Sequence, residues 1–378
     1  MRNLSRILVA IVVMLLALGI VMLASTSSVK GVKAFQDAHH YIKYQLLWLV
    51  VAVIISSVVA RVDYHVWSKV CWVLLALSVG LLILVFIPPF AHKAGGSYRW
   101  IRMGPVGFQP SELAKFAVVI GLSRWMASAG LRAGRLKEGF LVPLVGLSMV
   151  IVLVMLEPDF GTSILLLLTG MAIMFVGGTR LTHLVGLGIL GVAGLIGAIL
   201  QDPVRLDRIL AFLWPEKFPA KSYQLIQSKF AFISGGWSGV GLGNSMQKHL
   251  YLPEAHTDFI LAIIGEELGM VATIGVVLLF VCLFACGVAI SLRAPDPFGR
   301  YLAFGLTIVT VLQAVINVGV VTGCLPTKGL ALPFISYGGS GLVVSLLGMA
   351  VLVNVAEHGR NPEADGHTRP IKDRAHQF

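Results

Sequence analysis

Long runs of apolar residues, each about as long as a membrane-spanning helix, recur along the whole chain. A helix needs roughly 20 consecutive apolar residues to cross the hydrocarbon core of a bilayer. No small-residue cleavage site leads from the first run into a soluble domain, so we interpret this run as a retained helix. The pattern predicts an all-α polytopic membrane protein with about ten transmembrane helices, near residues 7–24, 45–60, 69–89, 112–129, 140–156, 160–177, 182–199, 262–291, 301–323 and 339–356.

One long region, residues 201–257, interrupts this pattern between the seventh and eighth predicted helices and is rich in Gly, Pro and polar residues. Connections longer than about 15 residues are usually functional in compact proteins. We therefore expect a large extracytoplasmic loop here. Residues 1–360 are predicted to form a single transmembrane domain, and residues 361–378 a short cytoplasmic tail.

The composition agrees with a membrane location. Of the 378 residues, 57% are hydrophobic and only 12% are charged, whereas a soluble domain carries roughly 25% charged residues. The formal net charge is +11. No basic run alternates with aromatic residues as in a nucleic-acid groove, so anionic lipid is the better expected partner and nucleic acid is not expected.

The orientation follows from the even number of predicted helices, which places both termini on one side. Lys and Arg are divided almost equally between the two sides. The positive-inside rule favours cytoplasmic termini once the long loop is set aside. The outer face is then unusually basic for a membrane protein.

Three stretches on the predicted outer face hold most of the unexpected polar residues, and the first covers residues 95–104 and 108–115. Ser111 is the expected N-cap of the fourth helix, with Glu112 in its first turn. Glu112 and Lys115 are three residues apart and share one helix face. They form either a structural ion pair or a charged pair that binds substrate or an ion at the mouth of a cavity, and the spacing supports both readings equally.

The second stretch covers residues 251–260 and ends where an apolar run begins. Asp258 lies at this boundary, with His256 and Glu254 just upstream. An acid here can simply complement the dipole of the following helix. Its position at the membrane edge also suits a general base or a cation ligand.

Two adjacent acids, Glu266 and Glu267, lie inside the apolar run that follows. Neighbouring residues cannot share one helix face, so at most one of them is expected to point into any given cavity. Polar contacts within the helix bundle and a role in substrate binding are equally compatible with this pattern.

The third stretch, residues 325–340, contains two prolines and several glycines. It predicts a fixed, irregular backbone between the ninth and tenth helices. Backbone amides in such a loop, together with Lys328, are suited to receive phosphate oxygens. Taken alone, the pattern is also that of a well-structured turn.

Together these stretches resemble the SEDS family, the RodA/FtsW peptidoglycan polymerases, in family order over nearly the whole chain. Residues 327–329 and 254–255 resemble the division branch, FtsW, more than the elongation branch, RodA, and the sporulation branch, which is close to FtsW, stays open as an alternative. Gly341 stands where a second serine is common and Ala331 where threonine is frequent, which weakens the subtype assignment more than the expected activity. The matching segments are FQPSELAK at 108–115, EPDFGTS at 157–163, YLPEAHTDF at 251–259, GEELG at 265–269 and LPTKGLALPFISYGGS at 325–340.

The resemblance implies a peptidoglycan glycosyltransferase that polymerises lipid II into β-1,4 glycan strands and releases undecaprenyl diphosphate. An α-linked donor that gives a β-linked product inverts, so one displacement with one base suffices. Asp258 matches the family's essential aspartate, as that base or as the ligand of a divalent cation such as Mg²⁺ or Mn²⁺. Substrate-binding roles are implied for Glu112, Lys115, Arg99, Trp100, Arg102, His256, Lys328, Ser336 and Tyr337.

The physical chemistry of the reaction agrees with this implied role. Fixed cations in a low-dielectric cavity stabilise a leaving diphosphate, which gives the basic outer face a purpose. Apolar grooves between helices can hold the polyprenyl tails. No GxxxxGK[ST] motif is present, and no nucleotide or organic cofactor is expected because the lipid-linked donor is already activated.

The resemblance also implies partners and a location. Because the chain has no transpeptidase domain, a class B penicillin-binding protein is the expected partner, with other membrane proteins of the division complex. The expected location is the bacterial inner membrane, at the division septum, with both termini cytoplasmic and the active site on the outer face. A lipid II flippase and a division scaffold without catalysis are the alternatives; the clustering of polar residues toward one face and the lack of a visible inverted repeat favour the enzyme.

Overall fold

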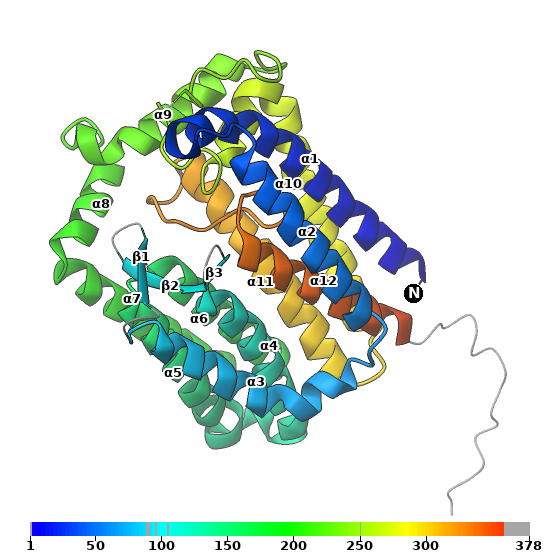
Figure 1. Ribbon diagram of the computed structural model, residues 1–378. Helices are drawn as coiled ribbons and strands as arrows, with labels where there is room; N and C mark the ends of the chain where they lie inside the picture. The colour runs from blue at the N-terminus through cyan, green and yellow to red at the C-terminus, as the bar shows by residue number, and fades with distance from the viewer. Residues whose placement is uncertain (1, 88–90, 95–96, 104–105, 250, 359–378) are drawn as a thin grey trace, which may run out of the picture.

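The computed structural model describes residues 2–87, 91–94, 97–103, 106–249 and 251–358. Within these residues, ten long helices form one bundle (Figure 1). The predicted tail, residues 361–378, lies outside the described residues. The bundle helices are α1 (Arg2–Phe35), α2 (His40–Val59), α3 (His65–Leu84), α4 (Pro110–Ala129), α5 (Val142–Leu156), α6 (Phe160–Val176), α7 (Leu181–Leu200), α10 (Ile260–Leu292), α11 (Pro297–Val321) and α12 (Gly339–His358).

These helices confirm the predicted all-α polytopic membrane fold, because each predicted segment overlaps one of them. Eight of the described helices are long and apolar enough to cross a membrane, and α6 is a shorter apolar helix. α4, which carries Glu112, Lys115 and Arg124, is not among the eight. The largest error in a boundary concerns the first helix, which extends to Phe35 instead of ending near residue 24.

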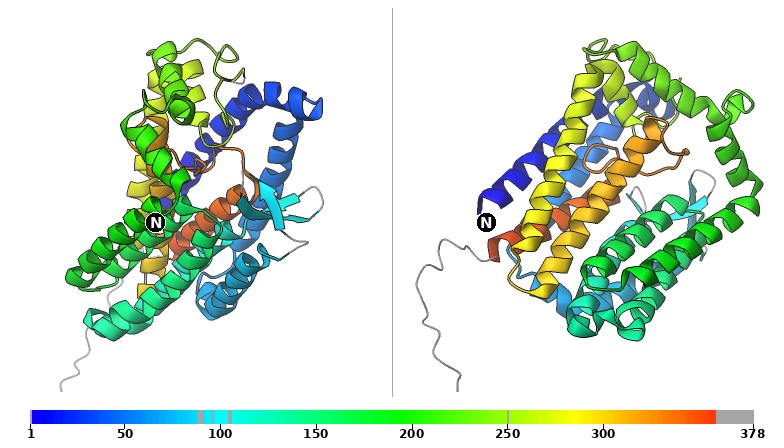
Figure 2. Two further views of the ribbon diagram at one scale, coloured as in Figure 1. Left: turned by 90° about the vertical axis from the view of Figure 1, so that its left-hand side faces the viewer. Right: turned by 180° about the vertical axis from the view of Figure 1, so that it is seen from behind.

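The start of α1 lies beside the end of α12, as Figures 1 and 2 show from opposite sides. Both described ends of the chain are therefore on one side of the bundle, as the even helix number predicted. The opposite end carries the long connection between α7 and α10, and we call it the loop end.

The long region 201–257, predicted as a loop, is partly helical. It contains α8 (Pro203–Leu213) and α9 (Pro219–Gly235), which lead from α7 toward α10 (Figure 2). Asp202 caps α8 by accepting a 2.9 Å hydrogen bond from the Val204 N–H, and Pro203 follows at the first helical position. Both features favour the start of a helix. The remainder of the region returns to α10 as irregular backbone.

A small antiparallel sheet, which the sequence did not predict, follows α3 at the loop end. Its strands are β1 (Ala91–Ala94), β2 (Ser97–Met103) and β3 (Val106–Phe108), in the order β1-β2-β3. Ile101 of β2 is buried and pairs with residues of both neighbouring strands. The sheet meets the bundle where β2 contacts α4 and β3 contacts α12.

The start of α4 corrects one predicted detail and confirms another. Gln109, not Ser111, occupies the N-cap position, and no side-chain hydrogen bond caps the helix. Pro110 takes the first helical position, which moves Ser111 inside the first turn. Glu112 lies in the first turn, as predicted.

Candidate active site

Asp258 lies at the loop end, two residues before α10, where several segments converge. Its backbone carbonyl accepts a 2.8 Å hydrogen bond from Asn317 Nδ2 of α11. A Cβ at residue 329 would lie 2.9 Å from Asp258 Oδ2, so the loop approaches this closely only because residue 329 is glycine. In the described part of the chain, the half-buried Asp258 carboxylate has no hydrogen bond or ion pair of its own.

The environment raises the pKa of Asp258 to about 7. Burial is the largest cause, followed by the nearby negative charges of Glu254 and Asp159, while Arg99 acts in the opposite direction. A carboxylate whose pKa lies near neutrality can accept a proton and remain substantially ionised. These properties suit Asp258 to act as a general base.

Arg99 connects the sheet to the turn between α5 and α6. From β2, its Nε donates to the Glu157 carbonyl at 3.1 Å, and its Nη2 donates to the Pro158 carbonyl at 3.0 Å. Its positive charge acts on both Asp258 and Glu157. The guanidinium is thus fixed close to Asp258 and Glu157, and its contact with substrate stays a prediction.

Two acids of this turn, Glu157 and Asp159, belong to the site but were given no role from the sequence. Asp159 caps α6 by accepting hydrogen bonds from the Thr162 N–H at 3.2 Å and from Thr162 Oγ1 at 2.9 Å. Glu157 is fully buried, and neither of its carboxyl oxygens has a hydrogen-bond partner among the described residues. Burial, followed by the charge of Asp159, raises the pKa of Glu157 to about 8 and keeps it uncharged at neutral pH.

Lys328 lies on the same side of Asp258 as this turn. Its Nζ is 5.1 Å from the centroid of the Phe160 ring at the start of α6. Leu330 packs against Gly161, where a Cβ would come within 3.0 Å of the Leu330 side chain. The structure therefore places both predicted cations, Arg99 and Lys328, against the α5–α6 turn.

His256 and Tyr337 lie together on a different side of Asp258. The Tyr337 N–H donates to the His256 carbonyl at 3.0 Å, and both rings face Tyr41 of α2. Burial, with a further contribution from Lys30, lowers the pKa of His256 to about 4. A neutral imidazole cannot pair with phosphate as a cation, so His256 is not an additional positive charge.

Ser336 is buried, and its hydroxyl already bonds within the chain. It donates to the Thr257 carbonyl at 2.6 Å and accepts from the Leu332 N–H at 2.8 Å. These bonds hold the loop before α12 against the residue that precedes Asp258. In this structure Ser336 helps to position Asp258 through these bonds to neighbouring backbone groups.

The remaining predicted residues of the sheet lie on β2. The half-buried Trp100 packs over β3, where a Cβ at Gly107 would lie 3.4 Å from Trp100 Cε3. Arg102 pairs with Gly107 in the sheet. The side chain of Arg102 lies outside the described residues, so its predicted contact with substrate stays a prediction.

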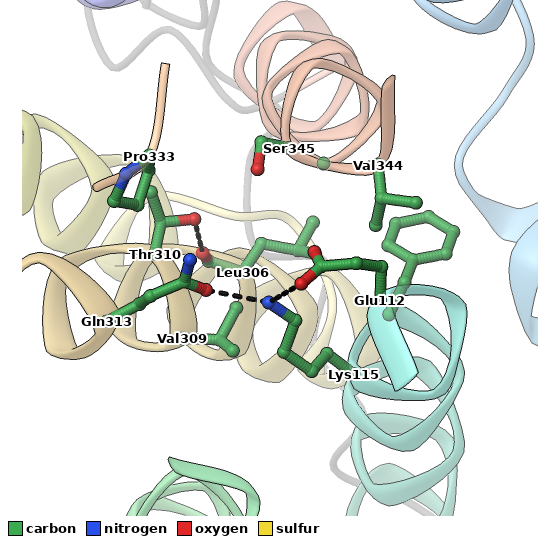
Figure 3. A pocket seen from close by; sticks show the side chains of 11 residues that line it. Glu112, Lys115, Leu306, Val309, Thr310, Gln313, Pro333, Val344 and Ser345 are labelled. Carbon is green, nitrogen blue, oxygen red and sulfur yellow. Dashed lines mark hydrogen bonds and ion pairs between the residues drawn. The ribbon is translucent and has the colours of Figure 1, made fainter. Parts of the chain in front are cut away.

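Glu112 and Lys115 form a second charged centre at the loop end (Figure 3). Lys115 Nζ lies 2.9 Å from Glu112 Oε1 and donates to Gln313 Oε1 of α11 at 2.7 Å. The two charges are therefore a buried ion pair. They line a small cavity of about 30 Å³, large enough for a water molecule, together with Thr310, Gln313, Pro333 and Ser345.

Gly341, one of the two departures from the family pattern, faces this pair. A Cβ at residue 341 would lie 3.4 Å from Glu112 Oε2. A serine there would bring its hydroxyl near the carboxylate. The glycine therefore leaves Glu112 one neighbouring hydroxyl fewer and leaves the ion pair itself intact.

Asp258 is not among the residues that line this cavity, but two amides of α11 join the two centres. Gln313 Nε2 donates to the Ala331 carbonyl at 2.8 Å. One helical turn further, Asn317 Nδ2 donates to the carbonyls of Leu330 at 2.7 Å and of Asp258. The segment that passes Asp258 is thus held by the same helix that binds Lys115. Neither amide was predicted from the sequence, although polar side chains inside a membrane helix usually face the bundle.

Glu266 and Glu267 form a third polar centre, which is structural. Glu267 is buried in an ion pair with Lys248 at 3.0 Å and accepts from Ser25 Oγ of α1 at 2.7 Å. Glu266 accepts from the Met246 N–H at 3.0 Å and from the Ser245 hydroxyl. Every carboxyl oxygen of the two acids has a partner.

Both adjacent acids bind the loop before Tyr251, and the expectation that at most one of them points into any given cavity stays a prediction. α10 breaks just after these acids, at Gly269, whose φ of 81° is left-handed. The Val240 and Gly241 N–H groups bond to the carbonyls of Glu266 and Glu267 at 2.9 and 3.0 Å. The loop thus bonds to both the backbone and the side chains of this turn.

The fold and the site together define a polytopic membrane protein with an acidic centre and fixed cations at one end of its helix bundle. The chain belongs to the SEDS family of cell cycle proteins, which includes FtsW, RodA and the sporulation protein SpoVE, and the family pattern matches residues 6–361. Its likeness to the FtsW branch is confirmed by its curated relatives. The probable peptidoglycan glycosyltransferase FtsW of Trichlorobacter lovleyi is 41% identical, over 93% of this chain and 92% of its own.

Other relatives and solved structures agree in length and fold. The stage V sporulation protein E of Bacillus subtilis is 39% identical over 94% of this chain and 97% of its own. A chain of a peptidoglycan synthase complex, solved to show how polymerization and crosslinking are coordinated, superimposes with a TM-score of 0.77 at 26% identity, over 93% of this chain and 96% of that chain. The rod shape determining protein RodA of Thermus thermophilus has the same fold, with a TM-score of 0.69 at 23% identity, over 94% of this chain and 97% of that chain.

Proposed function

We propose that this protein is a peptidoglycan glycosyltransferase that polymerises lipid II into β-1,4 glycan strands for septal cell-wall synthesis. The observation that carries the proposal is the half-buried Asp258 carboxylate, which has no partner in the described part of the chain and lies near a fixed Arg99. FtsW relatives of similar length are named as enzymes of this type.

In the proposed reaction, Asp258 accepts the proton of the acceptor 4-hydroxyl as that oxygen attacks C1 of the donor sugar. The bond between C1 and the diphosphate oxygen breaks, and the electron pair leaves with undecaprenyl diphosphate. The configuration at C1 inverts because a single displacement occurs. Proton transfer to a positioned base of this kind contributes about 10²- to 10⁴-fold to a rate.

The leaving diphosphate is stabilised by the cations beside the α5–α6 turn. Arg99 is already fixed by two carbonyls, so little reorganisation is needed when charge develops on the diphosphate. Lys328 lies against the same turn. Uncharged Glu157 adds no negative charge there, which preserves the positive potential that the diphosphate meets.

A divalent cation fits this site when the substrate supplies part of its ligands. Among the described residues, no group of three or more His, Cys, Asp or Glu side chains could hold a metal ion. Mg²⁺ is commonly bound by one or two carboxylates together with substrate phosphates. Asp258 would therefore hold such an ion jointly with the diphosphate, where the ion would neutralise charge on the leaving group.

The test is polymerisation of purified lipid II by the purified protein, with and without its penicillin-binding partner, in wild type and Asp258→Ala. Glycan strands from wild type that are lost in the variant are the expected result. If even the complex makes no strands, while vesicles that contain the protein move lipid II between leaflets, the flippase alternative replaces this proposal.

The expected partner is a class B penicillin-binding protein, because polymerised strands need crosslinking. A related chain, superimposing over most of this one, comes from a peptidoglycan synthase complex. α7 supports a membrane partner, since nearly all of its side chains are at least partly exposed. Co-purification in mild detergent is expected, with the loop end outside and both termini in the cytoplasm; consistent separation of the two proteins would contradict it.

A further inference from the structure

Aromatic rings gather where the corner between α1 and α2 meets the loops on either side of Asp258. The Phe35 and His40 rings stack with centroids 3.7 Å apart, and His40 lies 4.8 Å from Tyr44. Tyr41 contacts His256 at 4.8 Å and Tyr337 at 5.2 Å. We call this set the aromatic cluster: Phe35, His40, Tyr41, Tyr44, His256 and Tyr337.

The aromatic cluster is fixed relative to Asp258 by hydrogen bonds between three segments. Gln45, one turn beyond Tyr41 on α2, accepts from the Gly338 N–H at 3.2 Å and donates to the Ser336 carbonyl at 3.4 Å. The Tyr337 N–H in turn bonds to the carbonyl of His256, two residues before Asp258. The cluster is therefore held close to Asp258, with Phe35 exposed, His256 buried and the other four rings partly exposed.

A polar rim borders these rings. Lys30 and Glu254 form an ion pair at 3.3 Å, with side chains 37% and 50% exposed. Glu254 also accepts from Thr257 Oγ1 at 3.0 Å. Its φ of 55° lies in the left-handed region, which is strained for a non-glycine residue, and such strained residues cluster at functional sites.

This combination matches the chemistry of a sugar chain. A pyranose ring presents weakly positive C–H groups on its faces, which pack on the negative face of an aromatic ring. Its hydroxyl groups lie around the edge and bond to charged or hydroxyl side chains such as those of the rim. A diphosphate, in contrast, needs fixed cations, and those lie against the α5–α6 turn. Figure 1 shows the loop before α12 between the α1–α2 corner on one side and α6 with the sheet on the other.

We propose that the aromatic cluster and its rim form a glycan-binding subsite that holds the sugar rings of the acceptor strand with its 4-hydroxyl toward Asp258. This inference rests on the proposed polymerase function and adds that acceptor and donor bind on different sides of Asp258. The acceptor sugars bind on the α1–α2 side, and the donor diphosphate binds on the α5–α6 side. The opposing explanation is that the rings only anchor the helices at the membrane interface, as Tyr often does.

The experiment measures binding of a soluble tetrasaccharide of alternating N-acetylglucosamine and N-acetylmuramic acid to the full-length protein in nanodiscs by saturation-transfer NMR. Binding is expected for wild type and for Asp258→Asn, which lacks only the base. Tyr41→Ala and Tyr337→Ala are each expected to weaken binding about tenfold, as loss of a binding aromatic does. Tyr41→Phe keeps the ring and is expected to bind nearly as wild type.

Phe230→Ala, which removes an exposed ring of α9 that makes no ring contact with the cluster among the described residues, is the matched control and is expected to bind normally. Tyr41→Leu keeps apolar volume without a ring, so it separates stacking from folding if Tyr41→Ala is unstable. Absence of tetrasaccharide binding to wild type, or unchanged binding in Tyr41→Leu and Tyr337→Ala, would overturn the inference. If wild type polymerises lipid II in that case, the proposed function stands and only the subsite is wrong.

Discussion

Two groups of acids at the loop end have opposite surroundings. Glu266 and Glu267 are buried, and hydrogen bonds or an ion pair satisfy all of their oxygens. Asp258 and Glu157 are also taken from water, yet in the described part of the chain their carboxyl groups have no hydrogen bond. The loop that carries Lys248 supplies hydrogen-bond donors and a cation to Glu266 and Glu267. Arg99, in contrast, donates to backbone carbonyls and not to the carboxyl groups of Asp258 and Glu157.

This difference separates acids that hold the fold from acids that are available for chemistry. A buried polar group without a partner costs folding free energy, so native proteins contain few of them. The unpartnered carboxyl groups of Asp258 and Glu157 keep this cost in folding free energy. They lie near the fixed Arg99, where a substrate can supply the missing hydrogen-bond partners. From the sequence, polar contacts within the bundle and a substrate role were equally compatible with Glu266 and Glu267. Because all of their carboxyl oxygens already have partners in the chain, the structure favours the bundle contacts.

The largest expected effect is a loss of stability when Glu267 loses its ion-pair partner. Lys248→Ala leaves Glu267 buried without its cation, which costs about 3 to 5 kcal/mol of stability. Thermal unfolding in detergent measures this loss. Lys221→Ala, which breaks the partly exposed pair with Asp207, is the matched control and costs about 1 kcal/mol or less. Equal changes in Tm for the two variants would contradict the structural role of Glu267.

The next largest expected effect is a loss of polymerisation rate when Arg99, the cation near Asp258 and Glu157, is replaced. Arg99→Gln removes the guanidinium that is fixed on the Glu157 and Pro158 carbonyls. The rate of lipid II polymerisation should fall about 100-fold, because one preorganised donor is lost at the developing charge. The Tm should change little, since Arg99 bonds near the surface. A normal polymerisation rate in this variant would show that Arg99 does not stabilise the leaving diphosphate.

The pH dependence follows from the raised pKa of Asp258, which is about 7. A protonated Asp258 cannot accept a proton, so activity must be lost as the pH falls through this value. Between pH 8 and pH 6 the polymerisation rate should drop about tenfold. In Arg99→Gln the midpoint should move upward, because Arg99 lowers the pKa of Asp258. A rate that is flat from pH 8 to pH 6 would contradict the role of Asp258 as base.

The smallest effect is expected for Glu157→Gln. Glu157 is uncharged at neutral pH because its pKa is raised to about 8, so the amide resembles the native protonated form. The rate at pH 7 should change by less than about twofold. Above pH 8 the variant should lose less activity than wild type, because it cannot acquire a charge. A large loss at pH 7 would show that Glu157 acts as an ion.

The helices of the bundle could be predicted because long apolar runs have one physical explanation in a chain with so few charges. α8 and α9 were missed because short polar helices lack this signal, although the Asp202–Pro203 pair marks the start of α8. The sheet was missed because its short strands pair only with one another across turns.

The candidate site was predicted in part and for a different reason. Asp258 and Lys328 were candidates from their positions in the sequence, and the family resemblance added their specific roles and that of Arg99. Glu157 and Asp159 stood in a matching motif, but spacing cannot show that a turn about 100 residues earlier lies beside Asp258. Only tertiary packing brings these groups together.

The most direct test of this account compares Asp258→Asn with Glu267→Gln in one polymerisation assay of purified lipid II, normalised to folded protein. Both substitutions replace one carboxylate, half-buried in Asp258 and fully buried in Glu267, by an amide of the same shape. The account predicts that Asp258→Asn loses at least about 100-fold of the rate, while folded Glu267→Gln keeps its rate within about threefold. Retained activity in Asp258→Asn, or an equal loss in folded Glu267→Gln, would contradict the distinction between the open acid and the satisfied one.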